Sequence, residues 1–592
     1  MLQRAMQLGQ AGALPAARAL LDELLAASPS HPDALQLKGM IARRGGDNEE
    51  AVRWFQRSLR ANPAQPHVLS NLGNALLDLG EIDAAVRAYR EAVKMAPGNH
   101  DATAHLGMAL IARGDTREAC DVLERAVRNA PRHAKMWAVL GSALRAENRL
   151  AEAVTAFRNA LALRPGHVAT MHNLGVALRL SGQPGEAAAL LRTCATADPA
   201  SPEIHYNLGH CLQDLGDVTG AAEAYRRTIA LRPLDRDAHA SLARLCWQVG
   251  NNAAHLASYR ETLDRHSDDA GLLADLAHQL NLRGEQSEAA AALGNGFARG
   301  VDGAELRLRM GQALWGQGQV DAALAEWAAG RRMAPDDASL RRETARALII
   351  LARYEDALSE LGADEGADQQ SLAYRGLCWR FLGDPRADWL NNFDRFVHAA
   401  PLTPPDGTDI DSFNARLAAR LADLHAATRH PLDQTLRGGT QTTDDLFGRD
   451  IPEIRAVQAM IEAEVARYIA ALPDDSDHPF LRRKSQRFAF SGSWSVRLRR
   501  GGHHVNHVHP EGWISSCYYV ALPKAVDGSG HQGWLKFGES ALNLGPRESI
   551  ARVERPEVGK LVLFPSYFYH GTVPFDEEAD RLTIAFDVIP AA

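Results

Sequence analysis

The sequence predicts two regions of different fold, an all-α solenoid of repeated helical pairs followed by an antiparallel β jelly roll with flanking helices. Three observations support this multidomain arrangement. Small residues recur every 34 positions through the first two thirds of the 592-residue chain, a Pro- and Gly-rich break follows at 399–409, and strand-like runs begin at about residue 486. We expect the solenoid to span 1–397, a linker to span 398–412 and the second domain to span 413–592.

Composition and charge exclude several classes of protein. The chain is 46% hydrophobic and 23% charged, which is typical of a folded globular protein. Its net charge of −8 argues against a nucleic-acid partner. No apolar run approaches the roughly 20 residues of a membrane helix, and the first residues lack a secretory pattern. The 6 cysteines form no C-x-x-C pair, so we expect a reducing, cytoplasmic location.

The repeats follow a regular pattern of small, bulky and helix-ending residues. Small residues let two helices approach closely, and we expect the bulky residue that follows in each unit, such as Phe55 or Tyr89, to fill the space between neighbouring units. Gly46 and Asn148 illustrate the position where the first helix ends, because both residue types tolerate the left-handed conformation. The small residues are Gly39, Gly73, Gly107, Gly141, Gly175, Gly209, Ala243, Ala277, Gly311 and Ala345.

This pattern resembles the tetratricopeptide repeat (TPR), a helix–turn–helix of 34 residues, in about eleven units. TPR units stack into a superhelix with a concave groove. Asn71, Asn173 and Asn207 occupy the same place in their units, similar to the asparagine ladder that grips peptide backbones in the TPR array of O-GlcNAc transferase. The resemblance implies a peptide or protein in the groove. The alternatives are that these asparagines are only solvated, or that the array mediates self-association.

The second region is expected to begin with helices and to continue as strands. A helical stretch at about 410–428 precedes a loop at 430–448, and a further helix with one apolar face begins at Asp450. About seven strands within roughly a hundred residues then predict a sandwich or jelly roll. The strand candidates are RFAFSG, WSVRLRR, WISSCYYVAL, GWLKFG, SIARVE, GKLVLFP and RLTIAFDVI.

Four histidines lie in the segment GGHHVNHVHPEGW and suggest a metal site. Two of them, His507 and His509, point the same way on a strand and could reach one metal ion together. His570, at the end of GKLVLFPSYFYH, is the expected third ligand. An alternative pair is His509 with Glu511. For the other two, His503 and His504, we expect solvated turn positions.

The motif order resembles the Fe(II)/2-oxoglutarate oxygenases of the double-stranded β-helix fold. They share an H-x-D/E motif, a distal His and an Arg about ten residues later. The chain is most similar to the 2OG-Fe(II) oxygenase family that is often fused to TPR arrays. The matching segments are HPLDQTLRGGTQT, GSWSVRL, NHVHPEGWISSCYYVALP and LVLFPSYFYHGTVPF. In that family the first motif is commonly H-x-H.

The resemblance implies both cofactors and the residues that bind them. Iron(II) would be held by His507, His509 and His570, and no catalytic residue beyond these ligands is implied. The far carboxylate of 2-oxoglutarate would be gripped by Arg581, eleven residues after the distal histidine, with hydroxyls from Thr583 and Tyr519.

The function expected from these features is an iron-dependent 2-oxoglutarate oxygenase, a hydroxylase acting on a peptide or protein captured by the repeats. Two alternatives remain at this point. The first is a TPR scaffold whose jelly roll is a non-catalytic sensor or binding module. The second is a cupin-type dioxygenase that uses three histidines and no 2-oxoglutarate. Fold alone does not decide among them.

Overall fold

The computed structural model describes residues 1–592 except 363–367, 405–406, 426–434, 443–444, 450 and 592. The chain divides into two compact units, residues 1–211 and residues 212–592. Each unit is described by itself. None of the helices in the described ranges is both long and apolar enough to cross a membrane.

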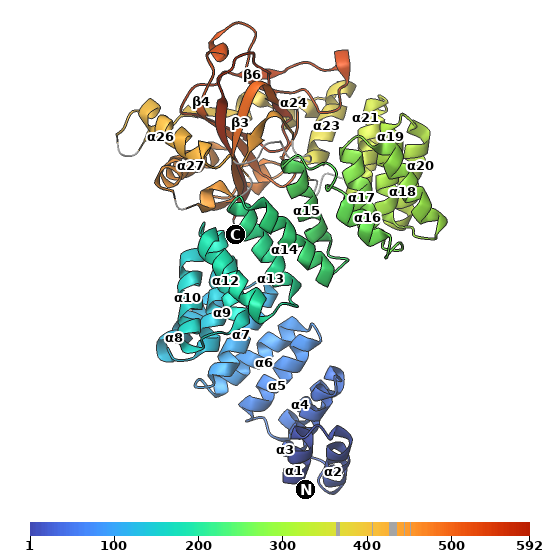
Figure 1. Cartoon of the computed structure of the whole chain (residues 1–592), viewed down its shortest axis with the longest axis vertical. Coiled ribbons are helices and arrows are strands. Elements are labelled where there is room, and N and C mark those ends of the chain that lie inside the picture. Colours follow the sequence, from blue (N-terminus) through green and yellow to red (C-terminus); the bar gives the residue numbers. More distant parts are fainter. Residues whose placement is uncertain (363–367, 405–406, 426–434, 443–444, 450, 592) are drawn as a thin grey trace. The chain divides into compact units, whose positions relative to one another are not determined.

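The first unit consists of antiparallel helical pairs, each packed on the next (Figure 1). The predicted all-α solenoid is confirmed. The helices are α1 (Leu2–Gln10), α2 (Leu14–Ala27), α3 (Pro32–Arg44), α4 (Asn48–Ala61), α5 (Pro66–Asp78), α6 (Ile82–Met95), α7 (His100–Arg113), α8 (Thr116–Asn129), α9 (Ala134–Ala146), α10 (Leu150–Leu163), α11 (Val168–Leu180) and α12 (Pro184–Ala197). Helix α13 (Pro202–Asp214) crosses from the first unit into the second.

Close packing inside each helical pair explains the small residues. A Cβ atom on Gly73 would lie 2.7 Å from the ring of Tyr89, and one on Gly39 would lie 2.7 Å from the ring of Phe55. The bulky residue therefore packs against the small residue of its own unit, not only between units as the sequence suggested. The expected left-handed residue at the end of the first helix is confirmed, because Asn148 has a φ of 57° where other units have glycine.

The second unit begins with further helical pairs. Its helices are α14 (Val218–Leu231), α15 (Arg236–Gln248), α16 (Ala257–Leu263), α17 (Ala270–Leu282), α18 (Gln286–Ala298), α19 (Ala304–Gly316), α20 (Val320–Met333), α21 (Ala338–Ile350), α22 (Tyr354–Leu361), α23 (Gln369–Leu382), α24 (Arg386–Leu390) and α25 (Phe393–Phe396). The last of them, α25, is followed directly by a strand.

Two antiparallel sheets form the C-terminal region, as predicted for a jelly roll. The larger sheet has the strand order β1-β7-β4-β9-β3-β2, and the smaller has the order β6-β5-β8. The strands are β1 (His398–Pro401), β2 (Leu436–Gln441), β3 (Phe488–His504), β4 (Ile514–Ala521), β5 (Leu535–Phe537), β6 (Arg552–Glu554), β7 (Lys560–Pro565), β8 (His570–Thr572) and β9 (Arg581–Pro590). Helix α26 (Ile410–Ala422) packs against β4, and helix α27 (Pro452–Ala471) packs against β7 (Figure 1).

Three details of this region differ from the sequence-based expectation. The first two strand candidates form one strand, β3, which continues through a bulge between Phe490 and Gly492. Strand β2 lies within the segment 430–448 that was expected to be a loop, part of which is outside the described residues. The stretch 398–412, expected as a linker, begins with β1, which pairs with β7.

Candidate metal centre

A cavity of about 470 Å³ lies against the inner face of the larger sheet. Strand register explains which side chains reach it. Val496 on β3 is paired with Thr583 on β9, and Thr583 is paired in turn with Tyr519 on β4. Because alternate residues of a strand share a face, one side of β9 presents Arg581, Thr583 and Asp587 to the cavity.

The structure brings together the three histidines singled out in the sequence. One ring nitrogen from each of His507, His509 and His570 lies within 4.8 Å of the other two. The Nε2 atoms of His507 and His509 are 3.1 Å apart, and the rings of His507 and His570 have centroids 4.2 Å apart. Two backbone hydrogen bonds of 2.9 and 3.0 Å join His507 to His570 and hold the distal histidine against the first motif. Glu511 lines the same cavity but is not part of this trio.

Each histidine of the trio makes a hydrogen bond through its other ring nitrogen. The Nδ1–H of His507 donates to the carbonyl of Val505 at 2.8 Å, and that of His570 donates to the carbonyl of Phe568 at 3.0 Å. With the proton held on Nδ1 by an acceptor, the Nε2 lone pair is free to bind a metal ion.

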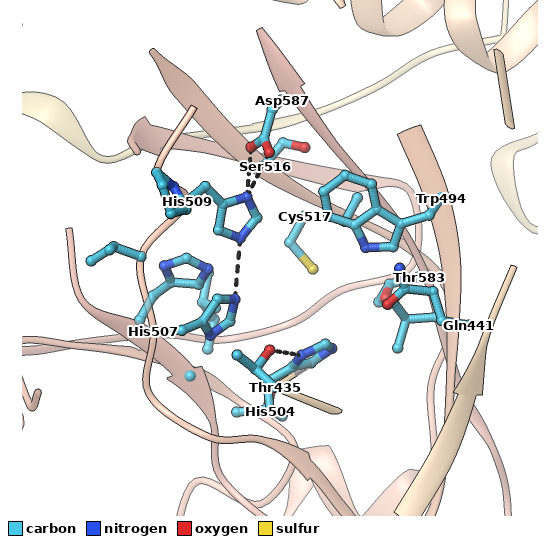
Figure 2. Close-up of a pocket in the computed structure, with 18 of the residues that line it drawn as sticks. Thr435, Gln441, Trp494, His504, His507, His509, Ser516, Cys517, Thr583 and Asp587 are labelled. Carbon is cyan, nitrogen blue, oxygen red and sulfur yellow. Dashed lines mark hydrogen bonds and ion pairs between the residues drawn. The ribbon is translucent and has the colours of Figure 1, made fainter. Parts of the chain in front are cut away.

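For His509 the acceptor is a carboxylate that the sequence analysis did not single out. Its Nδ1 lies 2.6 and 2.8 Å from the two oxygens of Asp587, and Figure 2 shows His509 between Asp587 and His507. Asp587 also accepts a hydrogen bond of 2.7 Å from the hydroxyl of Ser515. The two-residue periodicity from Arg581 through Thr583 to Asp587 was the available signal.

Burial keeps two histidines of the trio, His507 and His570, neutral. Desolvation of the imidazolium lowers the pKa of His507 to about 3, and the neighbouring His509 lowers it further. The same two causes, burial and adjacent histidines, hold the pKa of His570 well below its ordinary value. Neutral imidazole is the form that binds a metal ion, so these two ligands need no proton loss near neutral pH.

Other residues around the cavity were assigned no role from the sequence. His504, expected to be solvated, lines the cavity, and its Nδ1 lies 3.2 Å from the hydroxyl of Thr435. The indole of Trp494 stacks on His509 with centroids 5.8 Å apart, and Gln441 lies across the cavity from the trio (Figure 2). By contrast, among the described residues the His503 ring hydrogen-bonds only to the nearby carbonyl of Gly501.

A buried cation also lines the cavity. Arg581 is 1% exposed, its Nε donates to the carbonyl of Gly533 at 3.1 Å, and its guanidinium lies 5.2 Å from the ring of Tyr519. In the described part of the chain, no Asp or Glu side chain forms an ion pair with it. The Tyr519 hydroxyl is also buried, beside the thiol of Cys517, and makes no hydrogen bond to a nitrogen or oxygen atom of the described residues. A buried guanidinium that lacks a carboxylate partner, next to a buried phenol, fits an anionic ligand.

The three asparagines of the repeat array have different surroundings. Asn173 lines a hollow of about 620 Å³ between α7, α9 and α11. Asn207 already uses its amide, which donates to the carbonyl of Glu203 at 2.9 Å and lies 3.0 Å from the Nε2 of His172. Asn71 is half-buried on α5. Asn173 therefore lines an open hollow, whereas the side chain of Asn207 is hydrogen-bonded within the array.

The C-terminal region is thus a jelly roll with a histidine trio and a buried arginine in one cavity, and helical repeats precede it in the chain. Family models match both of these parts. Residues 492–587 match the family described as "Putative 2OG-Fe(II) oxygenase", and residues 308–371 match the tetratricopeptide repeat. Residues 2–241 match the C-terminal domain of cilia and flagella-associated protein 70. The chain thus contains tetratricopeptide repeats and a C-terminal region that matches the family described as "Putative 2OG-Fe(II) oxygenase".

Solved structures similar to the chain are TPR proteins. One is the C-terminal part of a TPR protein from Cytophaga hutchinsonii, with 17% identity over 41% of this chain and 99% of that chain and a TM-score of 0.32. Another is a TPR protein of Thermus thermophilus, with 22% identity over 31% and 99% and a TM-score of 0.27. A third is YrrB, described as a TPR protein with an unusual peptide-binding site, with 21% identity over 31% and 95% and a TM-score of 0.27. No curated protein matches the chain.

Proposed function

We propose that the C-terminal domain is an iron(II)- and 2-oxoglutarate-dependent oxygenase, a hydroxylase whose substrate is a peptide or protein captured by the repeats. The observation that supports this most is the histidine trio, with its Nε2 atoms turned together, in the same cavity as a buried arginine that has no acidic partner among the described residues. Metal ligands and an anion site in one cavity are what a metal-bound keto acid requires.

The residues have separate roles in this proposal. His507, His509 and His570 would hold Fe(II) through Nε2, leaving other coordination positions open. Arg581 would bind the far carboxylate of 2-oxoglutarate, with the hydroxyls of Thr583 and Tyr519 as further donors. With dioxygen as the oxidant, bound iron and 2-oxoglutarate would supply the oxidising chemistry: one oxygen atom enters the substrate as a hydroxyl group, and the other enters succinate as carbon dioxide is released.

The surrounding side chains keep the ligands in place. Asp587 holds the proton of His509 on Nδ1 and so fixes the direction of its Nε2 lone pair. Trp494 covers one face of the same ring and limits the access of water to it. Gly512 permits this close arrangement, because a Cβ atom there would collide with the hydroxyl of Ser566 and lie 3.4 Å from Cγ of Asp587.

The repeats of the first unit are the proposed capture surface. The hollow between α7, α9 and α11 combines apolar side chains with the amide of Asn173, which suits an extended backbone. The equivalent positions of the second unit, at the same spacing of 34, are Ser241, Asp275, Arg309 and Glu343. Asp275 forms a bidentate pair with Arg236 at 2.6 and 2.7 Å, so this part of the surface satisfies its own charges.

Anaerobic titration with Fe(II) and then 2-oxoglutarate tests the cofactor assignment. A visible metal-to-ligand charge-transfer band that needs both additions supports the proposal. Protein that binds no iron, or iron whose absorption does not respond to 2-oxoglutarate, contradicts it. Substrate class is tested separately, by measuring succinate formation with candidate peptides and with the Asn173→Ala variant.

One observation favours a second candidate function. The trio contains three imidazoles and no carboxylate, which is also the ligand set of cupin-type dioxygenases that use no 2-oxoglutarate. In that case iron would bind, and dioxygen would be consumed with a substrate in the absence of the keto acid. The buried Arg581, without an acidic partner in the described ranges, favours the first candidate over this one.

A further inference from the structure

The turn that precedes the distal histidine is held by the last helices of the repeat array. Tyr567 donates its hydroxyl to the carbonyl of Leu390 in α24 at 2.7 Å. Phe568 packs on Phe393 of α25, with ring centroids 4.7 Å apart. These contacts fix two consecutive aromatic side chains, each 1% exposed, against two successive helices.

A third aromatic residue of the same turn contacts a third helix. The side-chain amide of Gln370, in α23, donates to the hydroxyl of Tyr569 at 2.7 Å, and Tyr569 is the residue immediately before His570. Burial raises the pKa of the Tyr569 phenol well above its ordinary value, so this hydroxyl stays protonated and neutral.

The turn is in contact with two members of the histidine trio. The carbonyl of Phe568 accepts the Nδ1 proton of His570, and the carbonyl of Ser566 accepts the backbone N–H of His509 at 2.9 Å. A displacement of this turn would therefore move the distal histidine, its proton acceptor and the backbone of a second histidine together.

The last helices also belong to the same core as the sheets. One continuous cluster of buried side chains runs from Ala345 in α21 through α23, α24 and α25 to Val588 in β9. Strand β1, which follows α25 directly, is hydrogen-bonded to β7 at the edge of the larger sheet. These helices are therefore packed as part of the jelly roll, although they continue the repeats in sequence.

We propose that the end of the repeat array, helices α23 to α25, is a structural part of the metal centre. These helices position His570 and His509 through the turn at 566–569, with Gln370 and Tyr569 as positioning residues. This inference rests on the proposed function, since the trio is taken to bind iron. It also means that a catalytic domain cut at residue 395 or 413 lacks the support of its metal site.

The alternative is that these helices and the jelly roll simply pack together, without any effect on metal binding. The chain offers a matched control for this alternative. Arg547 joins the same jelly roll to the array by donating to the carbonyls of Ile349 and Ile350, at 3.2 and 2.9 Å, and to the Tyr354 hydroxyl at 3.1 Å. None of these contacts involves the turn at 566–569. Arg547→Met thus removes more hydrogen bonds from the junction than Gln370→Met does.

The test uses the full chain, with cobalt(II) as a spectroscopic probe of the trio. Cobalt affinity and ligand-field absorption are measured for wild type, Gln370→Met, Tyr569→Phe, the double variant and Arg547→Met, and circular dichroism checks that each is folded. We expect the two single variants to weaken cobalt binding by roughly three- to tenfold, below the 10–100-fold typical of groups bonded directly to a ligand. The double variant should equal either single one, because both remove one hydrogen bond.

The cobalt measurements have four outcomes, and each of them either supports or overturns the inference. Weaker binding and altered absorption in the Gln370 and Tyr569 variants, with wild-type values for Arg547→Met, support the inference. Unchanged cobalt binding in both single variants overturns it and leaves the proposed function intact. Equal losses in all variants, including Arg547→Met, overturn it in favour of general domain packing. A wild-type protein that binds no cobalt overturns the proposed function and this inference together.

Discussion

Replacement of Asp587 by asparagine tests how the carboxylate behind His509 contributes to metal binding. Both side chains are shielded, at 15% and 12% exposure, and the histidine Nδ1 faces both carboxylate oxygens at 2.6 and 2.8 Å. A hydrogen bond to a charged group is worth about 1.5–3 kcal/mol, against about 0.5–1.5 kcal/mol for a neutral pair. The asparagine side chain would keep one acceptor oxygen and lose the charge, so the cost is about 1–1.5 kcal/mol.

This difference corresponds to roughly a five- to twelvefold rise in the Kd for Fe(II) or Co(II), at about 1.4 kcal/mol per factor of ten. Metal titration followed by absorbance measures it. Asp580→Asn is the control, because Asp580 pairs with Arg497 at 2.6 Å where both side chains are about a third exposed, and such pairs contribute about 0–1 kcal/mol. Metal affinity equal to wild type in the Asp587 variant, or an equal loss in the control, would refute the reasoning.

Three further predictions concern the cosubstrate, the repeats and the substrate. Arg581→Met should raise the Kd for 2-oxoglutarate by roughly ten- to a hundredfold, as loss of a charged hydrogen bond implies, without changing iron affinity; an unchanged Kd by calorimetry removes Arg581 from the site. Gly73→Ala should destabilise the fold by about 1–3 kcal/mol, since the new methyl group meets Tyr89. Gly185→Ala, with open space around it, should not lower the melting temperature; equal melting of the two variants contradicts the packing argument. Asn173→Ala should weaken the binding of a peptide substrate, and wild-type affinity by fluorescence anisotropy would exclude the ladder.

The solenoid was predictable because its signals are local and repeated. The helix-ending position of each unit needs a left-handed residue, and Asn148 meets that need as glycine does elsewhere. The packing partner of each bulky residue was harder to predict, because a sequence period cannot distinguish packing within a unit from packing between units. A Cβ atom added to Gly73 would meet the ring of Tyr89, which shows that the bulky residue packs against the small residue of its own unit.

The candidate site was predictable in part, and its gaps have physical causes. The three histidines stood out because they are rare residues at strand spacing. Strand β2 was mistaken for a loop because Gly438 and Gly439 look like a turn, whereas a Cβ on Gly439 would lie 3.1 Å from Cα of Leu498 on β3. The glycines there permit a close approach of two backbones. Whether Arg581 has an acidic partner depends on every neighbour in space, which no single motif encodes.

The core shared by the last helices and the sheets also has a consequence for local opening. In a repeat array each unit depends mainly on its neighbours, so a free end frays at low cost. Residues from α21 onward cannot open in that way, because exposing Leu372 or Leu377 would also expose the interior of the jelly roll. Amide hydrogen exchange in α23 should therefore follow the exchange of β7 and β9, as one cooperative unit, while earlier helices exchange on their own.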